Sequence, residues 1–177
     1  MRASVYIAAS VDGFIARRDG SIDWLGNPEA DGEDYGYKAF FSSVDVLVMG
    51  RNTYETVLGF GDWPYADKRV IVLTRRPLVF PSHVPATVSA SSEQPAALLA
   101  RLEGEGARHL YVDGGITIQR FIAAGLIDEV TVTRIPLLLG DGIPLFGPTG
   151  GDLPLQHVRT QAYPNGFVQT TYRLRPD

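Results

Sequence analysis

Short apolar strands alternate with helical segments along the first 135 residues, and this alternation constrains the possible fold more than any other feature. The predicted strands are runs of β-branched and aliphatic residues that end in turn residues. They span residues 5–9, 44–49, 69–73, 110–112 and 129–135. Apolar residues at helical spacing predict helices at 33–43, 51–57, 92–103 and 117–124. Such alternation predicts a mostly parallel sheet with helices on both faces.

The end of the chain is predicted to form antiparallel strands. Pro164, Asn165 and Gly166 lie between two extended stretches, which is a typical hairpin signal. Beyond this turn, β-forming residues occupy every second position, and we expect the face that they share to be buried. These positions are 168, 170, 172 and 174. The predicted fold is therefore α/β, with an antiparallel hairpin at the C-terminal edge of the sheet.

Length and composition exclude several classes of protein. The 177 residues suffice for one domain, and we expect residues 1–177 to form a single one. Hydrophobic residues make up 45% of the chain and charged residues 20%, which excludes a disordered chain or a coiled coil. The net charge of −4 disfavours nucleic acid and acidic membranes as partners. No apolar run reaches the roughly 18 residues that span a bilayer, so we expect a cytoplasmic protein.

No metal centre is expected from the sequence. The chain contains no Cys, and its three His, at positions 83, 109 and 157, are far apart. Zinc sites use several Cys or His ligands, usually at close spacing. The lack of Cys also excludes a disulfide framework and a thiol nucleophile.

Three strand-to-helix junctions carry residues that suit a phosphate group. They span residues 49–53, 73–76 and 112–117, and in a parallel sheet all three lie at the carboxyl edge, where ligands bind. Glycines at the first and third junctions let backbone N–H groups approach a phosphate, and a helix N-terminus attracts an anion. The junctions therefore favour a pyrophosphate held between two helix starts.

Side chains at these junctions point to a particular nucleotide. Arg51, Arg75 and Arg76 add positive charge, and Thr53 and Thr117 add hydroxyl donors. A pair of arginines beside a ribose favours the 2′-phosphate of NADP over NAD. Taken singly, a Gly-Gly pair is more often a tight turn and a surface Arg pair is usually solvated. Their coincidence at one sheet edge favours the nucleotide interpretation.

Five motifs resemble a known superfamily. They are ASVDGFIA at 9–16, MGRNTYE at 49–55, VDGGIT at 112–117, AGLIDEV at 124–130 and PLLLGDG at 136–142. Together they resemble the dihydrofolate reductase superfamily, particularly the riboflavin-biosynthesis reductase domain and its stand-alone bacterial relatives, the bifunctional deaminase-reductase domain proteins. The resemblance extends from Val5 to about Leu174.

The resemblance implies a dihydrofolate reductase-like fold and an NADPH-dependent oxidoreductase. Such an enzyme transfers hydride to a C=N bond of a small nitrogen heterocycle, as 5-amino-6-(5-phosphoribosylamino)uracil reductase does. By position, the residues that would bind the cofactor are Ala9, Ile15, Gly50, Arg51, Asn52, Thr53, Thr74, Arg75, Arg76, Gly114, Gly115, Ile116, Thr117 and Ile118. Among them, Ala9 and Ile15 would flank the nicotinamide. The branch that the chain resembles also implies a homodimer.

The expected substrate-side residues are Asp34 and Thr133. By resemblance, Asp34 lies at the offset of the carboxylate that binds folate, and Thr133 matches its threonine partner. A carboxylate there would bind an amino-pyrimidine edge through two hydrogen bonds. A second interpretation stays open, because acidic residues at a helix N-terminus are favoured by capping and by the helix dipole.

Other functions also stay open at this point. Lys38 and Lys68 stand where a folate enzyme would carry an aromatic residue and an arginine, so folate is a doubtful substrate. The alternatives to a pyrimidine reductase are a dihydrofolate or pterin reductase, a catalytically silent NADPH-binding protein, and a purely structural domain. NADPH binding distinguishes the purely structural domain from the other hypotheses, because only a ligand that binds the native state raises the melting temperature.

Overall fold

The computed structural model describes residues 1–26, 32–66 and 68–174. The strands are β1 (Arg2–Ser10), β2 (Phe14–Ala16), β3 (Val46–Gly50), β4 (Arg69–Leu73), β5 (Val88–Ser91), β6 (His109–Asp113), β7 (Glu129–Ile135), β8 (Ile143–Pro144), β9 (Gln156–Ala162) and β10 (Val168–Arg173). The helices are the 3-10 helix η1 (Asp23–Leu25) and the α-helices α1 (Tyr37–Ser43), α2 (Arg51–Leu58), α3 (Pro95–Gly104) and α4 (Gly115–Ala123).

Within the described residues, eight strands form one sheet in the order β5-β4-β3-β6-β1-β7-β10-β9. The pairs from β5 to β7 are parallel, whereas β10 runs antiparallel to β7 and to β9. The short strands β2 and β8 form a separate antiparallel pair. The predicted α/β class and the antiparallel edge hairpin are confirmed.

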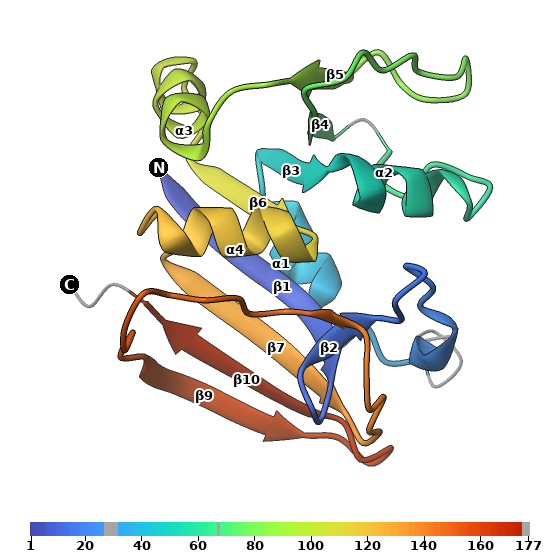
Figure 1. Cartoon of the computed structure of the whole chain (residues 1–177), viewed down its shortest axis with the longest axis vertical. Helices are drawn as coiled ribbons and strands as arrows, with labels where there is room; N and C mark the ends of the chain where they lie inside the picture. The colour runs from blue at the N-terminus through green and yellow to red at the C-terminus, as the bar shows by residue number, and fades with distance from the viewer. Residues whose placement is uncertain (27–31, 67, 175–177) are drawn as a thin grey trace.

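Helices cover both faces of this sheet. Helices α3 and α4 pack against one face with Leu98, Leu102 and Phe121, all of which are fully buried. Helices α1 and α2 pack an aromatic-rich layer against the other face. Figure 1 shows α4 in front of the sheet and α1 behind it. None of the helices in the described part of the chain is long and apolar enough to cross a membrane.

The strand order creates a switch point at the centre of the sheet. Strands β3 and β6 are neighbours, but the helices that follow them, α2 and α4, pack on opposite faces. In open α/β sheets, the crevice outside the carboxyl ends of such strands is the usual place for a ligand. The fold therefore places the first and third predicted junctions side by side.

The helix expected at 33–43 begins later, at Tyr37. Tyr35 and Gly36 have φ angles of 53° and 83°, in the left-handed region, so the chain cannot yet be helical there. The carbonyl of Tyr35 is held by the Tyr6 hydroxyl and by the side-chain amide of Gln169, contacts between residues far apart in the sequence. Tertiary contacts therefore override the local helical pattern.

The prediction for β10 is wrong, because the face that was expected to be exposed is the more buried one. Gln169 and Thr171 are only 4% and 3% exposed, whereas Val168 is 38% exposed. The buried polar side chains are paired with β7, because Gln169 Nε2 donates to Thr133 Oγ1 at 2.9 Å and the hydroxyls of Thr171 and Thr131 are 2.9 Å apart. Pairing across strands removes the cost of burying these polar groups.

Substitution of Phe121 tests the packing of the core between α4 and the sheet. Its side chain is fully buried, so Phe121→Ala should cost about 3–5 kcal/mol of unfolding free energy. The matched control is Val79→Ala, because Val79 is 88% exposed and its loss should change stability by less than about 0.5 kcal/mol. Urea denaturation of both variants measures the difference, and equal effects would contradict this packing.

Candidate functional site

The N-termini of α2 and α4 approach each other at the switch point, and two glycines permit this approach. A Cβ atom on Gly114 would lie 2.1 Å from Thr53 Oγ1, and one on Gly50 would lie 2.9 Å from Thr117 Oγ1. Each junction therefore uses its glycine to admit the threonine hydroxyl of the other helix. Gly114 also has a φ of +87°, which residues with a side chain rarely adopt.

These two helix starts offer unused backbone donors. Neither N-terminus has a side-chain cap. In α4, the N–H of Ile118 donates to the Gly114 carbonyl at 2.9 Å, so the free donors precede it at residues 115–117. Ile118 itself is fully buried in the core. Two converging helix N-termini with free N–H groups form a candidate anion site, because the dipoles of both helices favour negative charge there.

Positive side chains lie beside this anion site. Strand β4 ends next to β3, where Leu73 pairs with Gly50, and this brings residues 74–76 to the same edge of the sheet. Thr74 Oγ1 bonds the backbone of Arg76 and shapes the turn. Arg75 and Arg76 are exposed and enter no ion pair within the described ranges. Their charges are therefore available to a second phosphate.

Arg51 connects α2 to the turn that carries these arginines. Its Nε donates to Glu55 at 2.7 Å and its Nη1 donates to the carbonyl of Pro77 at 3.2 Å. The guanidinium thus braces the turn, although its side chain remains 23% exposed. Asn52, the next residue of α2, is exposed at the same edge.

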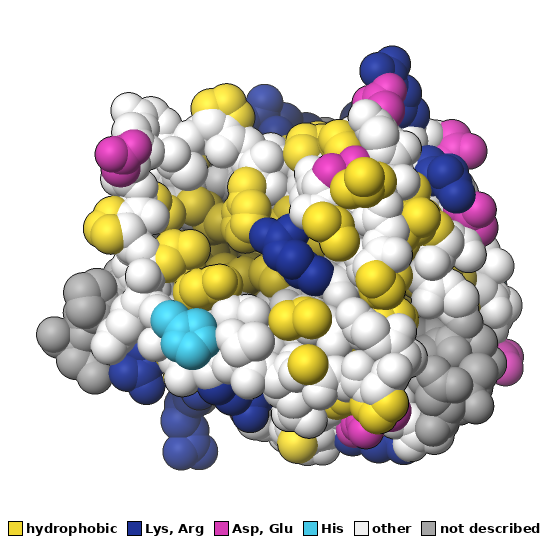
Figure 2. All heavy atoms as spheres, turned by 90° about the horizontal axis from the view of Figure 1, so that it is seen from below, with side chains coloured by type: hydrophobic (Ala, Val, Ile, Leu, Met, Phe, Trp, Pro, Cys, Tyr) yellow, Lys and Arg dark blue, Asp and Glu magenta, His cyan; other side chains and the backbone are white. Residues whose placement is uncertain are grey.

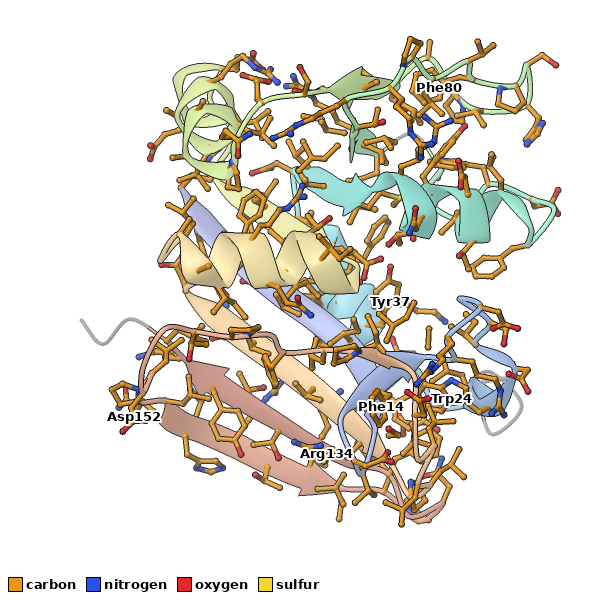
Figure 3. All side chains as sticks on the ribbon, in the orientation of Figure 1. Phe14, Trp24, Tyr37, Phe80, Arg134 and Asp152 are labelled. Atoms are coloured by element: carbon orange, nitrogen blue, oxygen red, sulfur yellow. The ribbon has the colours of Figure 1, made fainter. Side chains whose placement is uncertain are left out.

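The residues expected beside a nicotinamide lie on the other flank of the site. Ile15 Cδ1 lies 3.1 Å from where a Cβ on Gly115 would be, so Ile15 packs against the start of α4. Ala9 is fully buried in the core, and its side chain is therefore covered. Figure 3 shows Phe14, Trp24 and Tyr37 on this same side of the molecule, where the parallel strands end.

Asp113 is the acidic side chain closest in sequence to the paired helix starts, and the sequence motifs did not single it out for chemistry. It ends β6, directly before Gly114, and its carboxylate accepts the Gly114 N–H at 2.8 Å. Burial raises the pKa of Asp113 to about 6. Burial and the charge of Asp113 together also raise the pKa values of Tyr37 and Tyr65. The site therefore holds a carboxyl group with a raised pKa, beside an aromatic wall that includes Tyr37 and Tyr65.

The carboxylate of Asp34 is engaged at the start of α1. Its oxygens accept the backbone N–H groups of Gly36 at 3.1 Å and Lys38 at 3.0 Å. These two bonds hold the pKa of Asp34 below its usual value. Thr133 instead accepts a hydrogen bond from Gln169. The capping interpretation accounts for both oxygens of Asp34, and a role for Asp34 and Thr133 with substrate stays a prediction.

Asp12 and Lys68 have structural partners. The Asp12 carboxylate accepts the Ser10 hydroxyl at 2.6 Å and the N–H groups of Leu139 and Gly140 at 3.1 and 2.7 Å, so it joins the first loop to residues 139 and 140. Lys68 Nζ lies 4.8 Å from the centre of the Phe41 ring. The Ser-x-Asp-Gly motif therefore fixes the loop between β1 and β2.

Comparison with known proteins places this arrangement in a family. The model of the RibD C-terminal domain matches residues 4–169. The chain belongs to this family, which is a reductase domain of the riboflavin-biosynthesis type within the dihydrofolate reductase-like superfamily. The predicted resemblance is therefore confirmed at the level of the family.

Individual relatives agree with this assignment. The chain is 42% identical over 144 residues to the protein named "Uncharacterized protein YwjB" of Bacillus subtilis (strain 168), covering 80% of each chain. It matches the solved "Putative riboflavin biosynthesis protein" from Shewanella sp. PV-4 with a TM-score of 0.92 and 40% identity, over 99% of this chain and all of that one. It is also 30% identical over 151 residues to the riboflavin biosynthesis protein RibD of Corynebacterium ammoniagenes, covering 78% of this chain and 44% of that protein.

Gly114→Ala tests the close approach of the two helix starts. Gly125→Ala is the matched control, because Gly125 has a φ of +66° but no atom within 4 Å of an added Cβ. The control should therefore show only backbone strain, about 1–2 kcal/mol. Gly114→Ala should cost roughly 1–3 kcal/mol more, since its Cβ displaces Thr53. Equal losses of unfolding free energy in urea would show that the helix starts do not constrain each other.

Proposed function

We propose that this chain, as a single domain, is an NADPH-dependent reductase of a small nitrogen heterocycle. The observation that carries the proposal is the pair of uncapped helix N-termini that converge across Gly50 and Gly114. This arrangement suits a pyrophosphate, and the family is one of reductase domains. The proposed relatives in activity are the pyrimidine reductases of riboflavin biosynthesis.

The residues present fit NADPH in two separate ways. The N–H groups of residues 115–117 and those at the start of α2, with the hydroxyls of Thr53 and Thr117, would hold the pyrophosphate. Arg75 and Arg76, which have no ionic partner within the described residues, would hold the 2′-phosphate beside Thr74. When bound, NADPH would supply a hydride to the carbon of a C=N bond.

Asp113 would supply the proton that this reduction also needs. Reduction of C=N adds a proton to nitrogen, and a positioned acid accelerates such a transfer. Asp113 lies next to Gly114 and has a pKa raised to about 6 by burial, so it exchanges protons near neutral pH. Its carboxyl would give the proton to the substrate nitrogen, become a carboxylate and regain a proton from water.

The substrate class follows from which polar groups remain available. A dihydrofolate-type substrate would need the Asp34 carboxylate for its amino-pyrimidine edge, but this carboxylate caps α1. A pyrimidine that meets Asp113 and the aromatic wall fits better, and pterins are the alternative that an activity screen should include. We also propose a cytoplasmic homodimer with no nucleic acid or membrane partner.

Nucleotide binding provides the first test. At about 100 times Kd, NADPH should stabilise the protein by roughly 2.7 kcal/mol, which raises Tm by several degrees. The variant Arg75→Ala/Arg76→Ala should weaken NADPH binding by about 10- to 100-fold, because each lost charge-assisted bond contributes to affinity. Titration by isothermal calorimetry measures both affinities.

Two controls make this result specific. NADH lacks the 2′-phosphate, so the double variant should bind it almost as the unchanged protein does. Arg120→Ala removes an exposed arginine on α4 and should leave NADPH binding unchanged. Absence of any NADPH binding would overturn the reductase proposal, and binding without turnover of pyrimidines or pterins would favour a silent nucleotide-binding protein.

The role of Asp113 predicts a pH dependence. Because its protonated form is the donor, kcat/KM should fall as pH rises through about 6. Asp113→Asn should lower turnover by about 10²- to 10⁴-fold and remove this titration. Asp34→Asn is the matched control and should change turnover only a few-fold, because asparagine also caps helices. The opposite ranking of the two variants would assign the chemistry to Asp34.

Melting curves of the same variant test its environment independently of activity. The folded-state pKa of Asp113 is raised above the unfolded value, so its stabilising contribution is present at low pH and is lost as pH rises through about 6. A neutral asparagine avoids that loss. Asp113→Asn should therefore raise Tm at pH 8 relative to the unchanged protein, and a fall in Tm that is equal at pH 4 and pH 8 would contradict the raised pKa.

A further inference from the structure

A buried side-chain amide on β10 joins three separate elements of the fold. Nε2 of Gln169 lies 2.9 Å from the hydroxyl of Tyr6 on β1 and 2.9 Å from the hydroxyl of Thr133 on β7. The same atom donates to the backbone carbonyl of Tyr35, which precedes α1, at 3.0 Å. A carbonyl oxygen can only accept, so it takes one of the two amide protons. One side chain therefore fixes three chain segments relative to one another.

The amide of Gln169 lies on the α1 face of the sheet. Its neighbours Thr170 and Tyr172 line a hollow on the opposite, α4 face, and Figure 2 shows a hollow that hydrophobic side chains line. Successive side chains of a strand point to opposite faces, so Gln169 and Thr171 both face α1. The hydroxyl of Thr171 is also paired with a threonine of β7, at 2.9 Å. Two polar pairs between β10 and β7 thus lie side by side, and of the two residues it is Gln169 that bonds the segment before α1.

Tyr35, which this amide holds, has a strained backbone. Its φ of 53° lies in the left-handed region, which bulky residues rarely adopt. The Tyr6 hydroxyl donates to the same carbonyl as Gln169 does. At the other end of Tyr35, its hydroxyl accepts the side-chain amide of Asn165 at 2.7 Å, and its ring stacks on that of Phe167 with 5.3 Å between centroids. A strained residue persists where its surroundings over-determine it, and such residues are concentrated at functional sites.

The held segment sets the position of Tyr37, which belongs to the aromatic wall of the candidate site. Tyr37 is the first residue of α1, and the centroid of its ring lies 5.9 Å from that of Tyr6. Burial and then the charge of Asp113 raise the pKa of Tyr37, so the carboxyl group is near enough to act on its hydroxyl. Because Gln169 bonds both Tyr35 and Tyr6, its amide constrains Tyr37 from two sides.

We propose that Gln169 is a positioning residue, which holds the turn before α1 and thereby fixes the Tyr37 side of the site against the substrate ring. This inference rests on the proposed reduction of a nitrogen heterocycle beside Asp113 and adds the group that keeps the heterocycle in line. Hydride transfer depends steeply on the alignment of the reacting atoms. The amide bonds printed for Gln169 go to none of the residues at the starts of α2 and α4, so NADPH should bind without it.

The variant Gln169→Met tests this role, because methionine keeps the length of the side chain and loses the amide. The trial substrates are 5-amino-6-(5-phosphoribosylamino)uracil and dihydrofolate. For the compound that the unchanged protein reduces, KM should rise and kcat should fall, so that kcat/KM decreases by about 10- to 100-fold. KM for NADPH should stay unchanged. A fraction of unfolded protein lowers kcat alone, so the rise in KM separates a positioning role from a loss of stability.

Thr171→Val is the matched control. Thr171 is 3% exposed on the same face of β10, and its hydroxyl pairs with β7. Its loss should lower Tm and leave both KM values unchanged. A second variant, Tyr6→Phe, removes the other donor to the Tyr35 carbonyl and should raise KM for the heterocycle as Gln169→Met does. It decides the question if Gln169→Met does not fold.

Hydrogen exchange gives a readout that needs no substrate. The backbone N–H groups of Gly36 and Lys38 donate to Asp34 within the held turn. Gln169→Met should speed their exchange by at least about tenfold relative to Thr171→Val, because the turn opens more often. Equal exchange, or an active Gln169→Met protein with unchanged KM, would overturn this inference and leave the proposed reductase standing. An unchanged protein that reduces neither trial substrate would overturn the proposed reaction and the positioning role with it.

Discussion

The close approach of two helix N-termini is the constraint on which the proposed chemistry depends. Helices α2 and α4 pack on opposite faces of the sheet, yet they begin side by side because β3 and β6 are neighbours. Gly50 and Gly114 allow this approach, since a side chain on either would collide with a threonine of the opposite helix. The unused N–H groups of both helices then face one place, and an anion there interacts with both dipoles.

A half-buried carboxyl group next to this candidate anion site adds a second, opposing electrostatic feature. Burial removes hydration from the Asp113 carboxyl group, and among the described residues one hydrogen bond, from the Gly114 N–H, favours its charged form. Desolvation therefore dominates and raises its pKa. A protein gains no stability from such a group when it is ionised, which is typical of residues retained for chemistry. Asp12 and Asp34, by contrast, accept several hydrogen bonds that lower their pKa values and serve local structure.

Much of the fold followed from the sequence because strand and helix periodicity is local. The parallel sheet and the edge hairpin were predicted correctly, and the three junctions lie at the carboxyl edge of the sheet as expected, whereas their binding of phosphate stays a prediction. The parts that failed depend on contacts between distant residues. Tyr35 adopts a left-handed conformation because Tyr6 and Gln169 hold its carbonyl, and β10 buries Gln169 and Thr171 because β7 supplies their partners. Asp113 was not singled out from the sequence, since its raised pKa comes from burial that only the fold creates, whereas Asp34 was conspicuous in an acidic cluster.

Backbone amide chemical shifts provide the most direct test of the paired helix starts as the nucleotide site. NADPH would be titrated into the 15N-labelled protein, and every amide resonance would be followed. The account predicts that the largest changes occur at residues 51–53 and 115–117 together, with smaller changes at 74–76 and none beyond the noise in β9. Changes confined to one of the two helix starts, or centred on β7 and β10, would contradict a pyrophosphate held between α2 and α4.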